Sequence, residues 1–178
     1  MKKLLLIISC ILLIGCGYQK SATNEVRNYL NSYKDLDGSV LVQIEDEVNK
    51  DEYTDKQKKV YKDILKKQYQ DLSYKIEKEE KDGDITYVTV KVKVYDLYTA
   101  QNDASKYLSD HMDDFYDKNG KYDSSKYLDY KLNLMKNVTN KVEYTIVFSV
   151  EEKDGEFVVL QPSEVDLEKI HGVYNAEI

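Results

Sequence analysis

The chain has 178 residues, of which 26 are Lys or Arg and 33 are Asp or Glu, so its formal net charge is −7. Such an acidic surface repels phosphates, which argues against a nucleic-acid partner and against membrane binding through a basic patch. A single Pro, few Gly and regular hydrophobic periodicity argue against disorder, and the length after the first fifteen residues suits one domain.

The N-terminus has the form of a secretory signal. Lys2 and Lys3 precede an apolar run from Leu4 to Ile14, which is too short to span a bilayer. The run ends in Leu-Ile-Gly-Cys, which resembles the lipobox of bacterial lipoproteins. The resemblance implies cleavage before Cys16, diacylglycerol on its sulfur, and attachment to the outer face of the cell membrane.

Cleavage at that point divides the chain into three parts. Residues 1–15 are the signal peptide, residues 16–23 are the lipidated cysteine and a short linker, and residues 24–178 form a single domain. Two acyl chains on one cysteine give stable anchoring, and a soluble protein released after ordinary cleavage is the alternative. Because Cys16 is the only cysteine left after cleavage, we expect no disulfide and no hydrolysis by a Cys/His pair.

The first part of the domain has helical periodicity. Apolar residues recur every three or four positions in three segments. These stripes are Val26, Tyr29, Leu30 and Tyr33; Val40, Leu41, Ile44 and Val48; and Val60, Tyr61, Ile64, Leu65 and Gln68 or Tyr69. The expected N-caps are Thr23 or Asn24, Ser39, and Thr54 in a capping box with Gln57. The lysines of the third helix are interpreted as a solvated face.

The period then changes to two, as in strands with one buried face. Two hairpins are expected, one with Tyr74 and Ile76 against Val88 to Val94, the other with Val142 to Val150 against residues 157–160. The sequence Glu-Glu-Lys-Asp-Gly occurs at both turns and predicts a three-residue bulged loop in each. Those loops pair Ile76 with Val88, Tyr74 with Val90, Val150 with Val158, and Phe148 with Leu160.

Two helices are expected between the hairpins and one after them. Their stripes are Ala104, Tyr107, Leu108, His111, Met112 and Phe115, capped near Asn102 or Asp103; and Leu128, Leu132, Met135 and Val138, capped by Ser124 or Ser125. Ser163 caps the last helix and Gly172 ends it. The order predicts an α+β domain with helices packed on one face of a curved antiparallel sheet of two bulged hairpins.

Several stretches resemble uncharacterised lipoproteins of low-GC Gram-positive bacteria. They are the lipobox, Lys-Lys-Gln-Tyr-x-Asp-Leu-x-Tyr at 66–74, Val-Tyr-Asp at 94–96, Phe-Tyr-Asp at 115–117, Leu-Asp-Tyr-Lys-Leu at 128–132, and the segment 162–172. The resemblance implies an NTF2-like or cystatin-like α+β fold and an extracytoplasmic location. It implies no activity.

One cluster has metal-ligand chemistry. Asp110, His111 and Asp114 are spaced so that pairs of them share a helix face, which makes them candidate ligands. A solvated acidic face is the preferred interpretation, because the spacing fits no defined metal motif. We therefore expect no metal and no cofactor.

The 17 tyrosines could provide a stacking surface for a ligand. Many of them fall at core positions of the predicted helices and strands. The remaining candidates, near connections between strands and helices, are Tyr95, Tyr98, Tyr116, Tyr127 and Tyr130.

The sequence contains no Gly-rich phosphate loop and no nucleophile elbow. We expect a non-enzymatic, membrane-tethered domain that binds an unknown envelope protein or small ligand. The alternative is an enzyme that uses Asp or Glu together with His111 or His171, and a histidine beside a carboxylate in a cavity would favour it. A third possibility is a domain that acts on another protein through an uncovered sheet edge.

Overall fold

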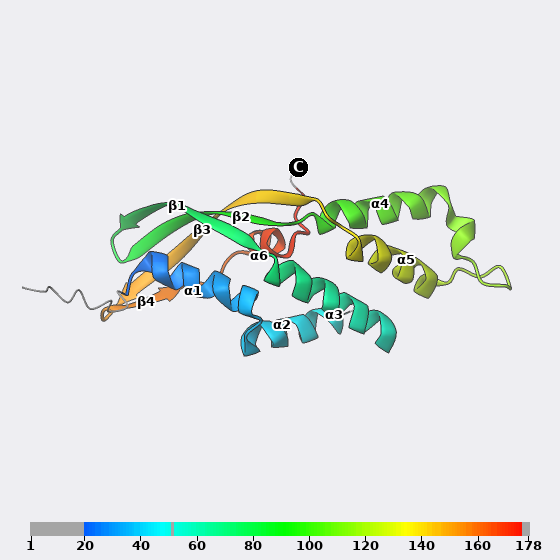
Figure 1. Ribbon diagram of the computed structural model, residues 1–178, viewed down its shortest axis with the longest axis horizontal. Helices are drawn as coiled ribbons and strands as arrows, with labels where there is room; N and C mark the ends of the chain where they lie inside the picture. Colours follow the sequence, from blue (N-terminus) through cyan, green and yellow to red (C-terminus); the bar gives the residue numbers. More distant parts are fainter. Residues whose placement is uncertain (1–19, 51, 176–178) are drawn as a thin grey trace, which may run out of the picture.

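Figure 1 shows a computed structural model of the chain, which describes residues 20–50 and 52–175. The expected signal peptide and Cys16 lie outside the described residues. Within the described ranges, six α-helices and one 3-10 helix accompany a four-stranded antiparallel sheet with the strand order β1-β2-β3-β4. The predicted α+β class is therefore confirmed.

The elements have the following bounds in chain order. They are α1 (Ala22–Asp35), α2 (Gly38–Val48), α3 (Asp55–Gln70), β1 (Ser73–Asp82), β2 (Ile85–Tyr95), α4 (Leu97–Asp110), the 3-10 helix η1 (Met112–Phe115), α5 (Ser124–Lys136), β3 (Lys141–Lys153), β4 (Glu156–Val159) and α6 (Glu164–His171).

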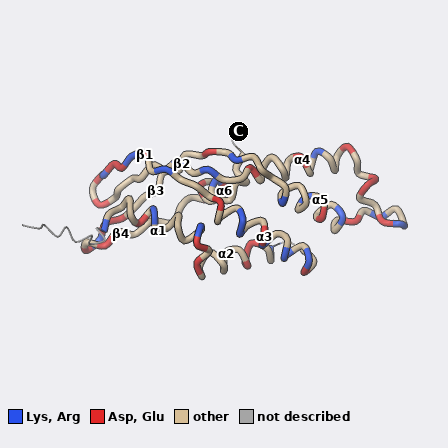
Figure 2. Tube along the Cα trace, viewed as in Figure 1, with Lys and Arg blue, Asp and Glu red and all other residues tan. Residues whose placement is uncertain are grey.

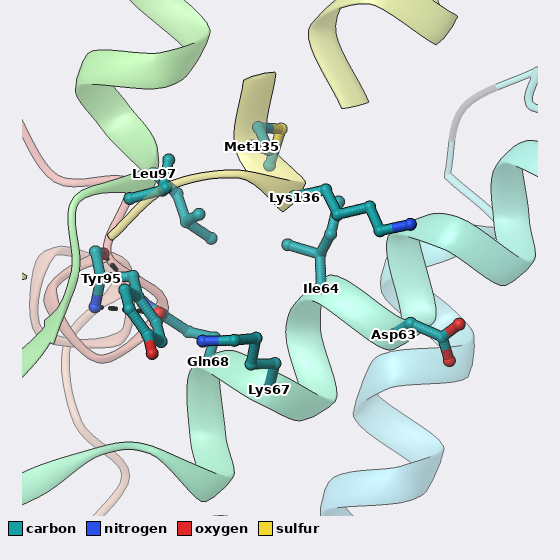
Figure 3. Close-up of a pocket in the computed structure, with 9 residues that line it drawn as sticks. Asp63, Ile64, Lys67, Gln68, Tyr95, Leu97, Met135 and Lys136 are labelled. Atoms are coloured by element: carbon teal, nitrogen blue, oxygen red, sulfur yellow. Dashed lines mark hydrogen bonds between the residues drawn. The ribbon is translucent and has the colours of Figure 1, made fainter. Parts of the chain in front are cut away.

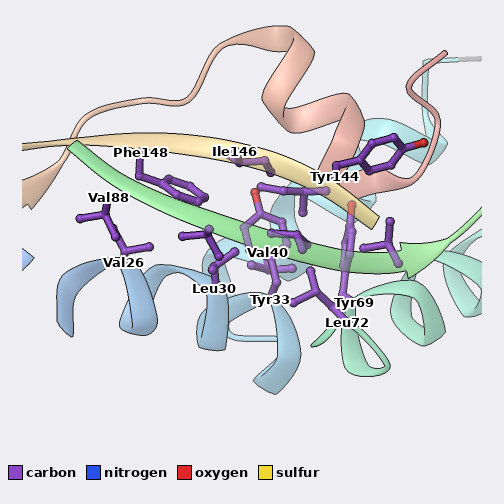
Figure 4. Close-up of a cluster of buried hydrophobic side chains, with 14 of the residues drawn as sticks. Val26, Leu30, Tyr33, Val40, Tyr69, Leu72, Val88, Tyr144, Ile146 and Phe148 are labelled. Atoms are coloured by element: carbon purple, nitrogen blue, oxygen red, sulfur yellow. The ribbon is translucent and has the colours of Figure 1, made fainter. Parts of the chain in front are cut away.

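Helices cover one face of the sheet, as the alternation predicts. The four valines of β2, from Val88 to Val94, are completely buried against α1, α3 and α6, whereas the alternating lysines of β2 are exposed. Figure 4 shows Val26 and Leu30 of α1 directed toward the sheet, where Phe148 lies. Each of these buried apolar side chains contributes about 1.5–3 kcal/mol, so this cluster is the main core.

Two helices extend beyond the sheet rather than covering it. Figure 1 shows α4 and α5 side by side as a projection past the ends of the strands, and we call residues 97–136 the arm. The base of the arm packs on α3 through a second apolar cluster that includes Ile64, Leu97, Leu132 and Met135. The sheet, α3 and the base of the arm therefore meet at one junction.

The helix predicted around Ala104 to Phe115 begins and ends earlier than expected. Asp96, not Asn102 or Asp103, is its N-cap, and the Asp96 carboxylate accepts a hydrogen bond from the Thr99 N–H at 3.0 Å. The helix ends at Asp110, because the next residue, His111, has a φ of −136° and a ψ of 43°, which are not helical. Phe115 consequently lies in η1.

The other caps were partly predictable. Thr54 forms the expected capping box with Gln57, and Ser163 caps α6. Three predicted caps are wrong by one to three residues, because the side chain that accepts the N–H bonds comes earlier in the chain: Ser21 for α1, Asp37 for α2 and Asp123 for α5.

The register of the first hairpin differs from the prediction. Asp82 pairs with Ile85, so the loop has two residues, and Gly83 has a φ of +61° as the first residue of a type II′ turn requires. A regular ladder from that loop would place Ile76 opposite Lys91. The pairing instead shifts between Ile76 and Lys78, and this bulge returns Ile76 to Val90 and the apolar face.

The second hairpin also has a two-residue loop. Asp154 and Gly155 have φ values of 54° and 77°, the pattern of a type I′ turn, and Val150 pairs with Val159 rather than Val158. The two similar sequences therefore form different turns. The prediction of a bulged loop in each is wrong, because neighbouring strands decide which residues occupy the loop.

One buried amide joins three segments where the sheet ends. Gln68 Oε1 accepts from the Tyr95 N–H at 3.0 Å, and Gln68 Nε2 donates to the carbonyl of Tyr95 at 3.1 Å and to that of His171 at 2.8 Å. The side chain is almost completely buried. It thus satisfies backbone groups of β2 and of the end of α6 that water does not reach.

Gly172 follows directly and has no room for a side chain. A Cβ there would lie 2.2 Å from both Gln68 Nε2 and the Tyr95 carbonyl oxygen, and its φ is +73°. Its own carbonyl accepts from the Tyr98 N–H at 2.8 Å. Glycine is therefore required for close approach as well as for backbone conformation.

We expect Gly172→Ala to lower the free energy of unfolding by at least ~3 kcal/mol, because the methyl group forces the Gln68 amide apart from its partners. Gly120→Ala is the matched control, since Gly120 has a φ of +74° and nothing within 4 Å of the added Cβ. It should cost only about 1–2 kcal/mol. Urea denaturation measures both, and equal losses would contradict the role given to the Gln68 contacts.

Candidate functional site

A mixed polar and apolar hollow at the junction, which we call the central cleft, lies between α2, α3, the base of the arm and α6. Its volume is about 460 Å³. Six side chains that define its chemistry are Glu47, Tyr53, Tyr61, Lys131, Glu168 and His171. The cleft therefore combines aromatic walls with charges of both signs.

His171 is the titratable group most changed by this environment. Its Nδ1 lies 2.6 Å from the hydroxyl of Tyr69, which is buried in the core behind the cleft. Burial lowers the pKa of His171 to about 4, an effect larger than the opposite influence of Glu47. The imidazole is consequently neutral at physiological pH.

The tautomer of His171 follows from its partner. Burial raises the pKa of Tyr69 well above its ordinary value, so the phenol keeps its proton and needs an acceptor. The nitrogen at 2.6 Å provides that acceptor, which places the imidazole proton on Nε2. His171 can thus offer a neutral N–H donor to the cleft, and it has no lone pair left there to accept a proton.

Some charged side chains of the cleft form ion pairs with each other, and others do not. Lys50 lies 2.6 Å from Glu47, one turn away on the same segment. Lys131 of α5 is half-buried, and its ammonium forms no ion pair or hydrogen bond with any other residue among 20–50 and 52–175. Tyr53 and Tyr61 form an aromatic pair with ring centroids 5.5 Å apart. An anionic group beside Lys131 and an apolar group beside the tyrosines would fit this lining.

A second hollow, which we call the apolar pocket, lies on the other side of the Gln68 contacts. Figure 3 shows Ile64, Leu97 and Met135 directed into it from α3, α4 and α5. Val138 and the ring of Tyr95 complete the walls, and the volume is about 260 Å³. Leu97 lines both hollows, so they are separated by little more than one side chain and the Gln68 amide.

Tyr95 is held on several sides. Its hydroxyl donates to Asp71 at 2.8 Å, and the ammonium of Lys67 lies 3.6 Å from its ring centroid. Lys67 also lies 2.9 Å from Asp71, and these contacts raise the pKa of Lys67 despite partial burial, while the bonds from Lys67 and Tyr95 lower the pKa of Asp71. Tyr95 is thus a tyrosine candidate that forms part of the apolar pocket's wall with charged groups beside it.

The five candidate tyrosines do not form one surface. Tyr95 and Tyr98 lie where β2 passes into the arm, whereas Tyr116, Tyr127 and Tyr130 lie at the far end of the arm around Phe115. Tyr127 and Tyr130 pack on Phe115 with ring centroids 5.7 and 5.8 Å away. Those three tyrosines therefore support the tip of the arm.

Two of the three candidate metal ligands, His111 and Asp114, contact Tyr107 instead of a shared site. His111 is exposed and stacks on Tyr107 with ring centroids 4.2 Å apart, and Asp114 accepts from the Tyr107 hydroxyl at 2.7 Å. Among the described residues, no three His, Cys, Asp or Glu side chains gather where they could hold a metal ion. Of the two histidines, only His171 lies in a cleft with carboxylates.

One edge of the sheet is uncovered. The outer part of β1, from Glu77 to Asp82, is exposed and consists of Glu, Lys and Asp. Strands with this many charges resist pairing with another strand, so the edge gives little support to β-strand addition.

Gln68 and Lys131 were not predicted as site residues. Gln68 occupies a position of the apolar stripe on α3, and a polar residue at such a position was the available signal. Its partners are 27 and 103 residues away, so the sequence could not identify them.

Comparison of the chain with protein families, with curated proteins and with solved structures finds no match in any of the three. The likeness to Gram-positive lipoproteins therefore stays a prediction.

The low pKa of His171 predicts a pH dependence of stability. The unfolded chain binds a proton near pH 6.5 and the folded chain near pH 4, so the unfolded state binds more protons between these values. The free energy of unfolding should therefore fall by about 3 kcal/mol from pH 6.5 to 4 and change no further through this residue below pH 4. Urea denaturation at several pH values measures it.

His171→Phe should remove most of this slope above pH 4.5, where the carboxyl groups with lowered pKa values, such as Asp71, do not yet contribute. His111→Phe is the control and should keep the slope, since His111 is exposed on the arm. Unchanged slopes in both variants would refute the assignment to His171.

Proposed function

We propose that this chain is a membrane-tethered, extracytoplasmic lipoprotein whose folded domain binds a small zwitterionic molecule in the central cleft without transforming it. The observation that supports this proposal is the lining of the cleft. The ammonium of Lys131 has no partner there among the described residues, and His171 offers an N–H donor. An anionic group of the ligand is bound by these two, and its cationic group by Glu47, Glu164 or Glu168. Tyr53 and Tyr61 contact its apolar part.

The tether is supported by the lipobox at Cys16. No helix within the described residues is both long and apolar enough to cross a membrane. Lys20, the first described residue, forms an ion pair with Glu156 at the tip of the second hairpin. The described chain therefore begins at the hairpin-tip end of the sheet, away from α6 and the arm (Figure 1).

A second candidate function is acid–base catalysis at His171. His171 lies in a cleft together with carboxylates, which is the arrangement that would favour an enzyme. Two observations favour binding instead: the Nδ1 of His171 is occupied by Tyr69, and its pKa of about 4 makes it a poor base at neutral pH. Binding is therefore the better-supported function.

Cys16→Ser should move the protein from the membrane fraction to the soluble fraction, because the hydroxyl cannot receive the diacylglycerol thioether. Fractionation with immunoblotting measures this. In mass spectrometry, the N-terminal peptide should be lighter by the mass of the diacylglycerol. Cys10→Ser is the matched control and should leave both unchanged, since Cys10 precedes the cleavage site. A Cys16→Ser protein that stays in the membrane would sink the proposed tether.

Free amino acids and dipeptides are the probes for the cleft, with acetate and ethylammonium as single-charge comparisons. We expect at least one zwitterion to bind in calorimetric titration more tightly than both comparisons. Lys131→Glu should weaken its binding at least tenfold, since like charges then face the anionic group. Lys118→Glu, the same charge change on the arm, should leave binding unchanged.

Equal binding in both variants, or no zwitterion preferred over acetate, would count against this site. Conversion of a bound probe that is lost in His171→Phe would instead establish the catalytic candidate.

A further inference from the structure

The apolar pocket has walls suited to an alkyl chain. Ile64, Leu97, Met135 and Val138 line it from three helices and the loop after α5, and the face of Tyr95 closes one side. Figure 3 shows no charged group of the drawn residues reaching between Leu97, Met135 and Ile64. A volume of about 260 Å³ is small for a complete ligand pocket, so it suits one chain rather than a ring system.

The mouth of this pocket is cationic although the protein is acidic. Lys67 and Lys136 lie on the rim, and Lys141 approaches the Tyr95 ring to 4.8 Å. Asp63 and Asp71 are the acidic residues there, so three ammonium groups face two carboxylates. Figure 2 shows further basic residues along α3.

Lys136 differs from the other two lysines. Lys67 is paired with Asp71, and Lys141 donates to the Asp71 carbonyl at 2.6 Å. Lys136 is exposed at the end of α5, and no interaction joins its ammonium to another residue of the described ranges. It is therefore available for an anionic group positioned at the mouth.

From this arrangement we propose that the apolar pocket binds a single-chain anionic amphiphile, with its alkyl chain among Ile64, Leu97 and Met135 and its carboxylate between Lys67 and Lys136. The inference goes beyond the proposed function and does not depend on the central cleft. Charge complementarity selects an alkyl carboxylate over an alkylammonium, and the walls select a chain over a short acid. Each buried methylene raises affinity about fourfold, so octanoate should bind roughly tenfold or more tightly than hexanoate.

The methionines provide a direct test. Met135 lies in the pocket wall, and Met112 is 43 % exposed near the tip of the arm. In the chain as isolated from expressing cells, labelled on the methionine methyl groups, octanoate should shift the Met135 signal in a saturable manner and leave the Met112 signal in place. Octylammonium and acetate, at the same concentrations, should shift Met135 at least tenfold less.

Lys136→Glu should weaken octanoate binding at least fivefold and strengthen octylammonium binding, with Lys118→Glu unchanged as the control. An unshifted Met135 signal with octanoate below its micellar range would overturn the proposal. So would equal binding of octanoate and octylammonium, or a Lys136→Glu variant with the affinity of the parent chain. Because these readouts concern Met135 and Lys136, failure here is distinguishable from failure of the central cleft, which is tested through Lys131.

Discussion

The arrangement of both hollows depends on the buried amide of Gln68. Its three hydrogen bonds join the end of β2 to the end of α6 across α3. If the amide were lost, the N–H and carbonyl of Tyr95 and the carbonyl of His171 would be buried without partners, and each such group costs about 1–3 kcal/mol. This single side chain therefore holds the end of β2 and the end of α6 against α3, and it binds the Tyr95 backbone just before the arm begins.

The same amide also couples the two hollows. Gln68 lines the apolar pocket, and the residue whose carbonyl it binds, His171, lines the central cleft. Leu97 contacts both spaces from the first turn of the arm. A ligand that displaced Leu97 in one hollow would change the wall of the other, because close-packed side chains transmit displacement over such short distances. Occupancy of the two sites is then expected to be linked through Leu97 rather than through the sheet.

The parts of the fold that could be predicted are those encoded by local periodicity. The stripes of α1 to α3, the alternation of β2 and β3 and the capping box at Thr54 each depend on residues close to one another in the chain. These predictions were confirmed except at Leu41 of α2, which is 39 % exposed. Strand register was not predictable. The bulge after Ile76 and the type I′ turn at Asp154 result from pairing with β2 and β3, and two nearly identical turn sequences gave different loops. For the site, the two histidines were visible, but only packing against Tyr69 distinguishes His171 from His111.

The position of the hollows bears on how ligands reach them. Lys20 lies beside Glu156 at the hairpin tips, and Tyr95 lies at the other end of the eleven-residue strand β2, about 30 Å away. With lipid on Cys16, as proposed, the intervening chain reaches at most about 14 Å when fully extended. A domain that stood upright on this proposed tether would have its hairpin tips toward the membrane and both hollows away from the headgroups. An amphiphile would therefore enter the apolar pocket as a monomer from water, where the cationic mouth on an otherwise acidic protein acts within a Debye length of about 10 Å.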